Sequence, residues 1–233
     1  MNAFHQLLPN GSIQFGIKLH DQAVKGFSDF LSHDNLLIFA AIKHRTVMES
    51  FATLIKNRRS TRKFTDELLT PEQVEMILKA ALMAPSSKRK NPWQFIVIED
   101  KKMLEQLAQC KPAGAAFLKD CALAVVVMAN VMESDVWVED ASVASIYMQL
   151  QAEDLGLGSC WCQVRKRYLD DDTDSAQFIR NLLDVPYQME VLSIIGFGHK
   201  AQERKPFDES HLQWEKVHIG SFRFPTENKS KEA

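Results

Sequence analysis

The 233-residue sequence has little net charge and no long apolar run. A formal charge of −2 gives no overall field that would attract nucleic acid or an anionic membrane. The longest apolar stretch, Cys121–Ala129, is far below the roughly 20 residues that cross a bilayer, so it predicts a buried strand instead. The sequence therefore predicts neither a nucleic-acid partner nor a membrane partner.

Cysteine is also scarce, with Cys110, Cys121, Cys160 and Cys162 the only four. The C-x-C pair at positions 160 and 162 lacks the second ligand pair of a zinc site, so we expect buried thiols and no metal site. The first residues do not show the charged flank, apolar stretch and small-residue cleavage site of a secretory signal. We therefore expect a cytoplasmic protein.

With 45% hydrophobic residues, the chain can bury a substantial core as one domain. Residues 1–47 show no clear periodicity, and we interpret them as an N-terminal extension of unknown role. Helical spacing sharpens after Met48, where Phe51, Leu54 and Ile55 follow the i, i+3, i+4 rule. The domain is therefore expected to span residues 48–233, including a C-terminal arm.

Helices and strands alternate along this domain. Thr70-Pro71-Glu72-Gln73 combines an N-cap, a proline at the first helical position and a capping-box glutamine, which predicts a helix that Pro85 ends. Further helices are expected at residues 101–110, 138–155 and 175–183, and strands at 95–98, 123–128 and 191–197. Gly156-Leu157-Gly158 is expected to end the long helix. The pattern indicates an α/β or α+β layered domain.

Two faces of the 138–155 helix are distinct. One side carries large apolar residues, Val143, Ile146, Tyr147 and Leu150. Small residues cluster nearby, at 141, 142, 144 and 145, and small side chains permit close helix approach. We expect the small face, near Ala144, to suit a two-fold interface, where the same patch meets itself.

Two clusters carry the strongest chemical signal. Arg58-Arg59-Ser60-Thr61-Arg62 places three guanidinium groups within five positions, which suits a phosphate because each planar fork donates paired, charge-assisted hydrogen bonds. Ala84-Pro85-Ser86-Ser87, running into Asn91-Pro92-Trp93, offers hydroxyls, an amide and a flat aromatic, which suit the edge of a planar heterocycle. Alone, the first cluster is more typical of a solvated loop after a helix, and the second can be a plain helix-ending turn. Together they indicate a phosphorylated flat cofactor.

In order and spacing, these segments resemble the FMN-dependent nitroreductase family. Arg58 to Phe64 is similar to the family's R-R-S-x-R-x-F signature, and Ala84 to Phe95 is similar to its A-P-S-S-x-N-x-Q-P-W segment. Ala152–Trp161 resembles the family's long dimer helix with the loop that follows it. One departure is clear: aligned on Pro92-Trp93, the family's Asn falls on Arg89 and its Gln on Asn91.

The resemblance implies an α+β fold, a three-layer α/β/α sandwich whose mixed, mainly antiparallel sheet is flanked by helices. It also implies a homodimer with two FMN sites at the subunit interface and terminal segments that embrace the partner. The expected function is ping-pong hydride transfer from NADH or NADPH through FMN to nitroaromatics, quinones or similar small-molecule acceptors. No catalytic side chain and no metal is expected.

The expected cofactor contacts follow the matching segments. Phosphate and ribityl contacts are expected from the arginine cluster and the C-terminal side, and ring contacts from the remaining segments. The full set is Arg58, Arg59, Ser60, Arg62, Pro85, Ser86, Ser87, Arg89, Asn91, Cys160, Trp161, Gln163, Gly196, Arg204 and Lys205.

Two alternatives stay open at the level of sequence. The same resemblance covers other flavin chemistry, namely dehalogenation, flavin fragmentation and peptide oxidation, and it covers a non-enzymatic flavin-binding dimer. Lys88-Arg89-Lys90 is either a wet surface or a site that draws the phosphates of NADPH.

Overall fold

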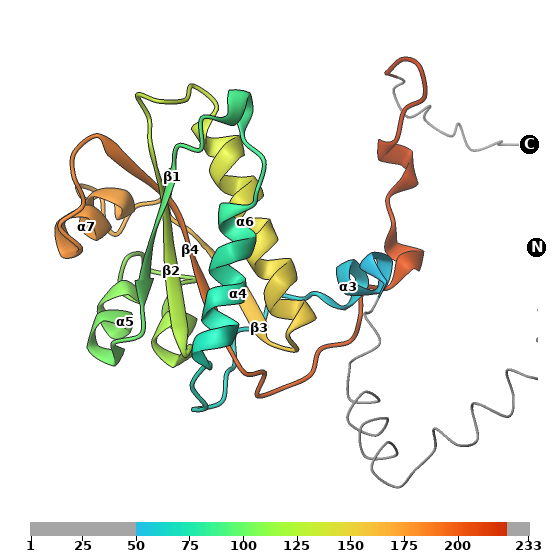
Figure 1. Cartoon of the computed structure of the whole chain (residues 1–233), viewed down its shortest axis with the longest axis horizontal. Coiled ribbons are helices and arrows are strands. Elements are labelled where there is room, and N and C mark those ends of the chain that lie inside the picture. The colour runs from blue at the N-terminus through green and yellow to red at the C-terminus, as the bar shows by residue number, and fades with distance from the viewer. Residues whose placement is uncertain (1–49, 223–233) are drawn as a thin grey trace, which may run out of the picture. The chain divides into compact units, whose positions relative to one another are not determined.

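A four-stranded sheet forms the centre of the computed structural model, which describes residues 50–222 (Figure 1). The strand order is β1-β2-β4-β3, with β1 at Trp93–Ile98, β2 at Leu123–Asn130, β3 at Gly158–Gln163 and β4 at Met189–Gly198. All three strand pairs are antiparallel, and one parallel bridge joins Ser60 to Ser159 beside β3. The expected N-terminal extension lies outside the described residues.

Helices cover both faces of the sheet, so the three-layer α+β fold is confirmed. α4 (Pro71–Leu82) and α6 (Trp137–Asp154) lie on one face, and α5 (Lys101–Leu107) and α7 (Ser175–Leu182) on the other (Figure 1). The remaining elements are α3 (Phe51–Asn57) and the 3-10 turns η1 (Ser87–Arg89), η2 (Ala116–Asp120), η3 (Glu209–His211) and η4 (Trp214–Lys216). No helix within residues 50–222 is long and apolar enough to cross a membrane.

Strand β2 explains why both faces need cover. Its residues Leu123, Val125 and Val127 pack into the cluster under α4 and α6, while the alternate residues pack toward α5 and α7. Successive side chains of a strand point to opposite faces, so a strand buried on both sides must be apolar throughout. This is why the apolar run at 121–129 predicts the central strand correctly.

The helix starts follow the local sequence. The Gln73 backbone N–H donates to Thr70 Oγ1 at 3.3 Å, and the Thr70 N–H donates to Gln73 Oε1 at 2.9 Å. The predicted capping box is therefore confirmed, with Pro71 at the first helical position. Asp100 and Asp174 are the N-caps of α5 and α7, and their carboxylates accept one and two backbone N–H groups, respectively.

The segment after α6 differs from the expectation of a loop. Gly156, at φ +73°, ends the helix as predicted, and the Leu157 N–H donates to the Ala152 carbonyl at 2.8 Å. Gly158 then begins β3 instead of extending a turn. A Cβ at Gly158 would lie 2.6 Å from Thr61 Cγ2, so only glycine lets the arginine cluster approach this strand.

The two faces of α6 are used in the opposite sense to our expectation. Ala141, Ala144 and Met148 are fully buried in the protomer, where α6 packs on α4 and the sheet. The small face near Ala144 is therefore not free for a two-fold interface. Ile146 and Tyr147 of the apolar stripe are exposed instead, while Val143 and Leu150 are half-buried.

Candidate functional site

The segment that follows α3 is fixed along the outer edge of β3. The Thr61 N–H donates to the Ser159 carbonyl at 2.9 Å, which forms the parallel bridge. Further along, the Thr65 N–H donates to the His199 carbonyl at 3.0 Å, and the Ala201 N–H donates to the Lys63 carbonyl at 3.1 Å. Backbone hydrogen bonds thus position the arginine cluster, because its neighbours are tied to the ends of two strands.

A cleft of about 710 Å³ opens beside this segment. We call it the arginine cleft. It is lined by Ala52, Ile55, Lys56, Arg58, Arg59, Ser60, Arg62, Arg204, Phe207, Glu209 and Leu212. The cleft therefore brings together five predicted cofactor residues. Arg58, Arg59, Ser60 and Arg62 come from the N-terminal cluster, and Arg204 lies almost 150 positions further along the sequence.

The charge of the arginine cleft is strongly positive. Five of its lining residues are cationic, and its single acid, Glu209, pairs with Lys56 at 2.8 Å. Within residues 50–222, no carboxylate forms an ion pair with any of the four lining arginines. Their charge is therefore left to bind an anion, and guanidinium forks favour a phosphate.

The C-terminal arm, which is the segment that follows β4, forms the second wall of the cleft. The Phe207 N–H donates to the Lys56 carbonyl at 2.8 Å, and the Arg59 guanidinium lies 5.9 Å from the centre of the Phe207 ring. Phe207, Glu209 and the α3 residues of the cleft were missed by sequence reasoning. No local pattern marks them, because they meet only when the arm folds back on α3.

Strand β3 supplies the next group of predicted residues. Cys160 is buried, its thiol donates to the Trp161 carbonyl at 3.8 Å, and burial raises its pKa. The Trp161 indole N–H donates to Gln163 Oε1 at 2.9 Å, and the Gln163 amide donates to the Arg165 carbonyl at 2.9 Å. The side chain of Gln163 is therefore already hydrogen-bonded within the protein. Only the backbone groups of β3 remain to contact a ligand.

The loop that joins α4 to β1 is tightly held. Ser86 Oγ donates to Asn91 Oδ1 at 2.6 Å and accepts the Asn91 N–H at 3.0 Å. The Ser87 N–H donates to Asp140 Oδ1 at 2.7 Å, and this buried carboxylate also accepts the Ser134 hydroxyl at 2.9 Å. Pro85, Ser86 and Ser87 thus belong to a built turn anchored on α6.

This loop also carries backbone strain. Lys88, Arg89 and Asn91 have φ of 51°, 55° and 48°, in the left-handed region that favours glycine. Such conformations cost about 1–3 kcal/mol each and persist where surrounding contacts enforce them. Lys88, Arg89 and Lys90 are all exposed to solvent.

Comparison with known proteins decides the family. The family model described as Nitroreductase family matches residues 55–111 and 110–199. The chain belongs to the nitroreductase family.

Three relatives show how far the similarity extends. A "Putative NADH dehydrogenase/NAD(P)H nitroreductase" of Archaeoglobus fulgidus is 35% identical over 161 residues, 67% of this chain and 89% of that protein. The solved structure of an FMN-dependent nitroreductase from Clostridium difficile R20291 is 46% identical with a TM-score of 0.73, covering 74% of this chain and 100% of that one. Iodotyrosine deiodinase 1 of Mus musculus is 34% identical over only 61 residues, 26% of this chain and 21% of that protein.

The nitroreductase fold places the two predicted motifs far apart within one chain. The Pro85–Asn91 loop leads into β1, at one edge of the sheet, while Ser60 bridges to β3 at the other edge. Three strand spacings of roughly 4.8 Å separate these edges, about 14 Å in all. The pairing of Trp93 with Ala129 and of Ser159 with Phe197 also puts them at opposite ends of the strands. One protomer therefore does not bring the two motifs together.

Two further predicted residues lie outside the arginine cleft. Gly196 is buried near the end of β4, where a Cβ would lie 2.9 Å from Phe117 Cε2, so it serves close packing of the core. Lys205 is exposed and is not among the residues that line the cleft, whereas Arg204 is. Of the two C-terminal cations, the structure therefore favours Arg204.

Proposed function

We propose that the protein is an FMN-dependent oxidoreductase that takes a hydride from NADH or NADPH and reduces small acceptors such as nitroaromatics or quinones. The observation that carries this proposal is the arginine cleft. Four arginines that pair with no carboxylate within residues 50–222 line a space of about 710 Å³ at the edge of the sheet of a nitroreductase-family chain. The relatives support the cofactor and the donor, because their names include an FMN-dependent nitroreductase and an NAD(P)H nitroreductase.

The residues of the cleft fit the phosphate end of FMN. Arg58, Arg59 and Arg62 would hold the phosphate from one wall, with Arg204 from the other, and the Ser60 hydroxyl lies within the same cleft. Paired guanidinium forks bind a dianion both by charge and by geometry. When bound, FMN supplies the hydride acceptance and donation, so the chain needs no acid or base of its own.

The outer edge of β3 fits the flavin ring. Ser159 directs its carbonyl away from β4, toward Thr61, and backbone groups two residues along a strand point to the same side. Trp161 therefore presents its N–H along this edge, close to the arginine cleft. Backbone donors fixed in this way would stabilise negative charge that develops on a reduced ring.

A second copy of the chain would complete the site. The strained Pro85–Asn91 loop cannot reach the cleft of its own protomer, and the hydrogen bond from the Ser86 hydroxyl to Asn91 holds it in a fixed shape. We infer a homodimer in which each cleft receives this loop from the partner. The exposed apolar stripe of α6 supports this arrangement, because Ile146 and Tyr147 remain in water in the single chain.

Dehalogenation is the second candidate. It is favoured by the short match to an iodotyrosine deiodinase, whereas the NAD(P)H nitroreductase matches along two thirds of the chain. Product analysis separates the two activities. Reduced nitro or quinone products with no halide release support the first proposal, and halide release from a halogenated phenol at the higher turnover supports the second.

The test of the proposed function begins with the absorption spectrum of the purified full chain. We expect a yellow protein with bound FMN that is bleached by anaerobic titration with NADH or NADPH and regains colour when a quinone is added. A protein that is colourless, does not bind added FMN, and does not oxidise either nicotinamide would contradict the proposal.

A further inference from the structure

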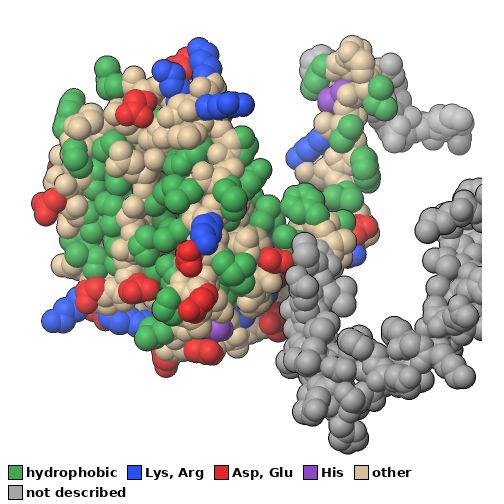
Figure 2. Space-filling model, viewed as in Figure 1, with side chains coloured by type: hydrophobic (Ala, Val, Ile, Leu, Met, Phe, Trp, Pro, Cys, Tyr) green, Lys and Arg blue, Asp and Glu red, His purple; other side chains and the backbone are tan. Residues whose placement is uncertain are grey.

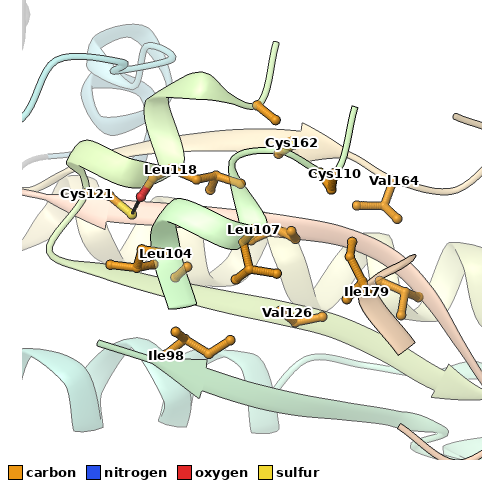
Figure 3. Packing of buried hydrophobic residues seen from close by; sticks show 14 of the residues in the cluster. Ile98, Leu104, Leu107, Cys110, Leu118, Cys121, Val126, Cys162, Val164 and Ile179 are labelled. Carbon is orange, nitrogen blue, oxygen red and sulfur yellow. Dashed lines mark hydrogen bonds between the residues drawn. The ribbon is translucent and has the colours of Figure 1, made fainter. Parts of the chain in front are cut away.

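Two buried thiols meet on the side of the sheet covered by α5 and α7. Cys110 lies just after α5 and Cys162 lies on β3, and both are fully buried in the same hydrophobic cluster (Figure 3). Their side chains lie close together within this cluster (Figure 3) and interact electrostatically. The proposed flavin chemistry uses neither of them.

A lysine makes this pair chemically asymmetric. Lys111 donates from Nζ to the Gln163 carbonyl at 2.8 Å, which holds the ammonium group beside Cys162. The neighbouring Cys110 thiol lowers the pKa of Cys162 and outweighs burial, which raises it, and the Lys111 charge lowers it further. The neighbouring Cys162 thiol, together with burial, raises the pKa of Cys110. One sulfur is thus the better nucleophile, and the other keeps its proton.

We propose that Cys110 and Cys162 form an oxidisable dithiol that hydroperoxides convert into a disulfide between the end of α5 and β3. The Cys162 thiolate attacks the peroxide oxygen, the O–O bond breaks, and a sulfenic acid forms as the leaving oxygen departs with a proton. The Cys110 sulfur then attacks the sulfenic sulfur, its proton and the hydroxyl leave as water, and the S–S bond closes. Two thiols are oxidised, and one peroxide is reduced to two molecules of water when the peroxide is hydrogen peroxide.

The surrounding chain gives this pair a route to solvent. Cys110 is followed directly by the Lys111–Gly114 segment, in which Pro112 and Ala113 are exposed and Gly114 has φ +79°. The Ser175 hydroxyl donates to the Cys110 carbonyl at 2.7 Å. This hydrogen bond keeps Cys110 in place if the Lys111–Gly114 segment opens. A small neutral oxidant therefore needs only a local opening.

Cys160 is the competing partner, and geometry disfavours it. It lies two residues before Cys162 on the same face of β3, about 6.6 Å away along the strand. That spacing is at the upper limit for a disulfide, and the two side chains run parallel. Strand β3 also carries Ser159, which bridges to Ser60 of the arginine cleft, so a cross-link at Cys162 would fix the strand that borders the cleft.

The test maps disulfides in the purified full chain after treatment with hydrogen peroxide. The protein is alkylated under denaturing conditions without reductant, digested and analysed by mass spectrometry. We expect a Cys110–Cys162 cross-linked peptide, the loss of two of the four thiols, and full recovery with dithiothreitol. Cys121 is the internal control, because burial raises its pKa to about 12 and it should stay reduced.

Three variants sharpen the result. Cys160→Ser should form the same cross-link at the wild-type rate. Cys110→Ser should stop at a Cys162 sulfenic acid that dimedone traps, and Cys162→Ser should leave Cys110 reduced, with oxidation at least tenfold slower. A Cys160–Cys162 bond, four reduced thiols in the wild type, or unchanged oxidation in Cys162→Ser would overturn the proposal. The wild-type and Cys160→Ser maps decide the question even if the other variants fold poorly.

Discussion

At the residue scale, the arginine cluster was the most informative stretch of sequence. Three guanidiniums in five positions indicated an anion site, and the structure places Arg58, Arg59 and Arg62 in one cleft. Sequence could not identify Phe207 or Glu209 as their neighbours, because these residues reach the cleft through the fold of the arm onto α3. Local composition thus predicted the chemistry of the site. It could not predict the second wall of the cleft, because that wall depends on contacts between residues far apart in the sequence.

The first prediction concerns the two arginines at the centre of the cluster. Arg58→Ala with Arg59→Ala should weaken FMN binding roughly 10- to 100-fold. Hydrogen bonds to charged groups contribute about 1.5–3 kcal/mol each, and solvent screening at these half-exposed side chains reduces that value. Fluorescence titration of the deflavinated protein measures the change. Lys102→Ala, an exposed cation on α5, is the matched control, and equal FMN affinity in the double variant and the control would count against the phosphate assignment.

The second prediction concerns the close approach of Gly158 to Thr61. Gly158→Ala should destabilise the protein by about 1–3 kcal/mol, because its Cβ would lie 2.6 Å from Thr61 Cγ2 and 2.8 Å from Thr61 Cβ. FMN affinity should fall as well, since Thr61 lies inside the arginine cluster.

A double-mutant cycle isolates this contact. Thr61→Gly removes the obstructing atoms, so Gly158→Ala should cost less in that background than in the wild type. Urea unfolding of the four proteins gives the coupling free energy. Additive effects of the two substitutions would show that the steric contact is not the cause.

At the scale of elements, patterns with a local cause were predicted well. The capping box of α4 and the glycine that ends α6 depend on neighbouring residues, and both are confirmed. Strand β3 was missed, because Gly158–Gln163 contains a glycine and two cysteines and becomes a strand only through its pairing with β4. The faces of α6 were reversed for a related reason: periodicity locates an apolar stripe without saying what covers it.

The third prediction tests the ion pair that joins the end of β4 to the end of α6. Lys200 Nζ lies 2.8 Å from Glu153 Oε1, and the side chains are only 14% and 8% exposed. Lys200→Met would leave the carboxylate buried without its partner, so we expect a loss of about 3 kcal/mol in the free energy of unfolding. Chemical denaturation measures this loss.

The double variant Lys200→Met with Glu153→Leu is the control for this pair. Because it removes both charges and leaves no buried carboxylate, it should be clearly more stable than Lys200→Met alone. A double variant that is as unstable as the single one would mean that packing of the two side chains, rather than the unpaired charge, sets the cost.

At the scale of the whole molecule, a single chain does not bring the two predicted motifs together and leaves large apolar side chains exposed. The two motifs lie at opposite edges of one sheet, and hydrophobic side chains are plentiful on the side where α4 and α6 lie (Figure 2). In the arm, Trp214 and Ile219 are 70% and 88% exposed, more than a compact monomer accounts for. Sequence resemblance implied a homodimer, and these features support the same proposal from physical grounds, although through a different face of α6.

The last prediction tests that proposal through the apolar stripe of α6. The native chain should have a solution mass of about 53 kDa, twice the 26.5 kDa of one copy. Ile146→Glu with Tyr147→Glu places two charges on the stripe and should shift the mass to 26.5 kDa in light scattering. Bound FMN should be lost together with the dimer, because each arginine cleft would lose the loop supplied by the partner. Tyr187→Glu changes the same residue type at a 93% exposed position in the turn before β4, and it should keep both the dimer and the flavin. A double variant that stays dimeric and yellow would place the interface elsewhere and would separate cofactor binding from this face of the helix.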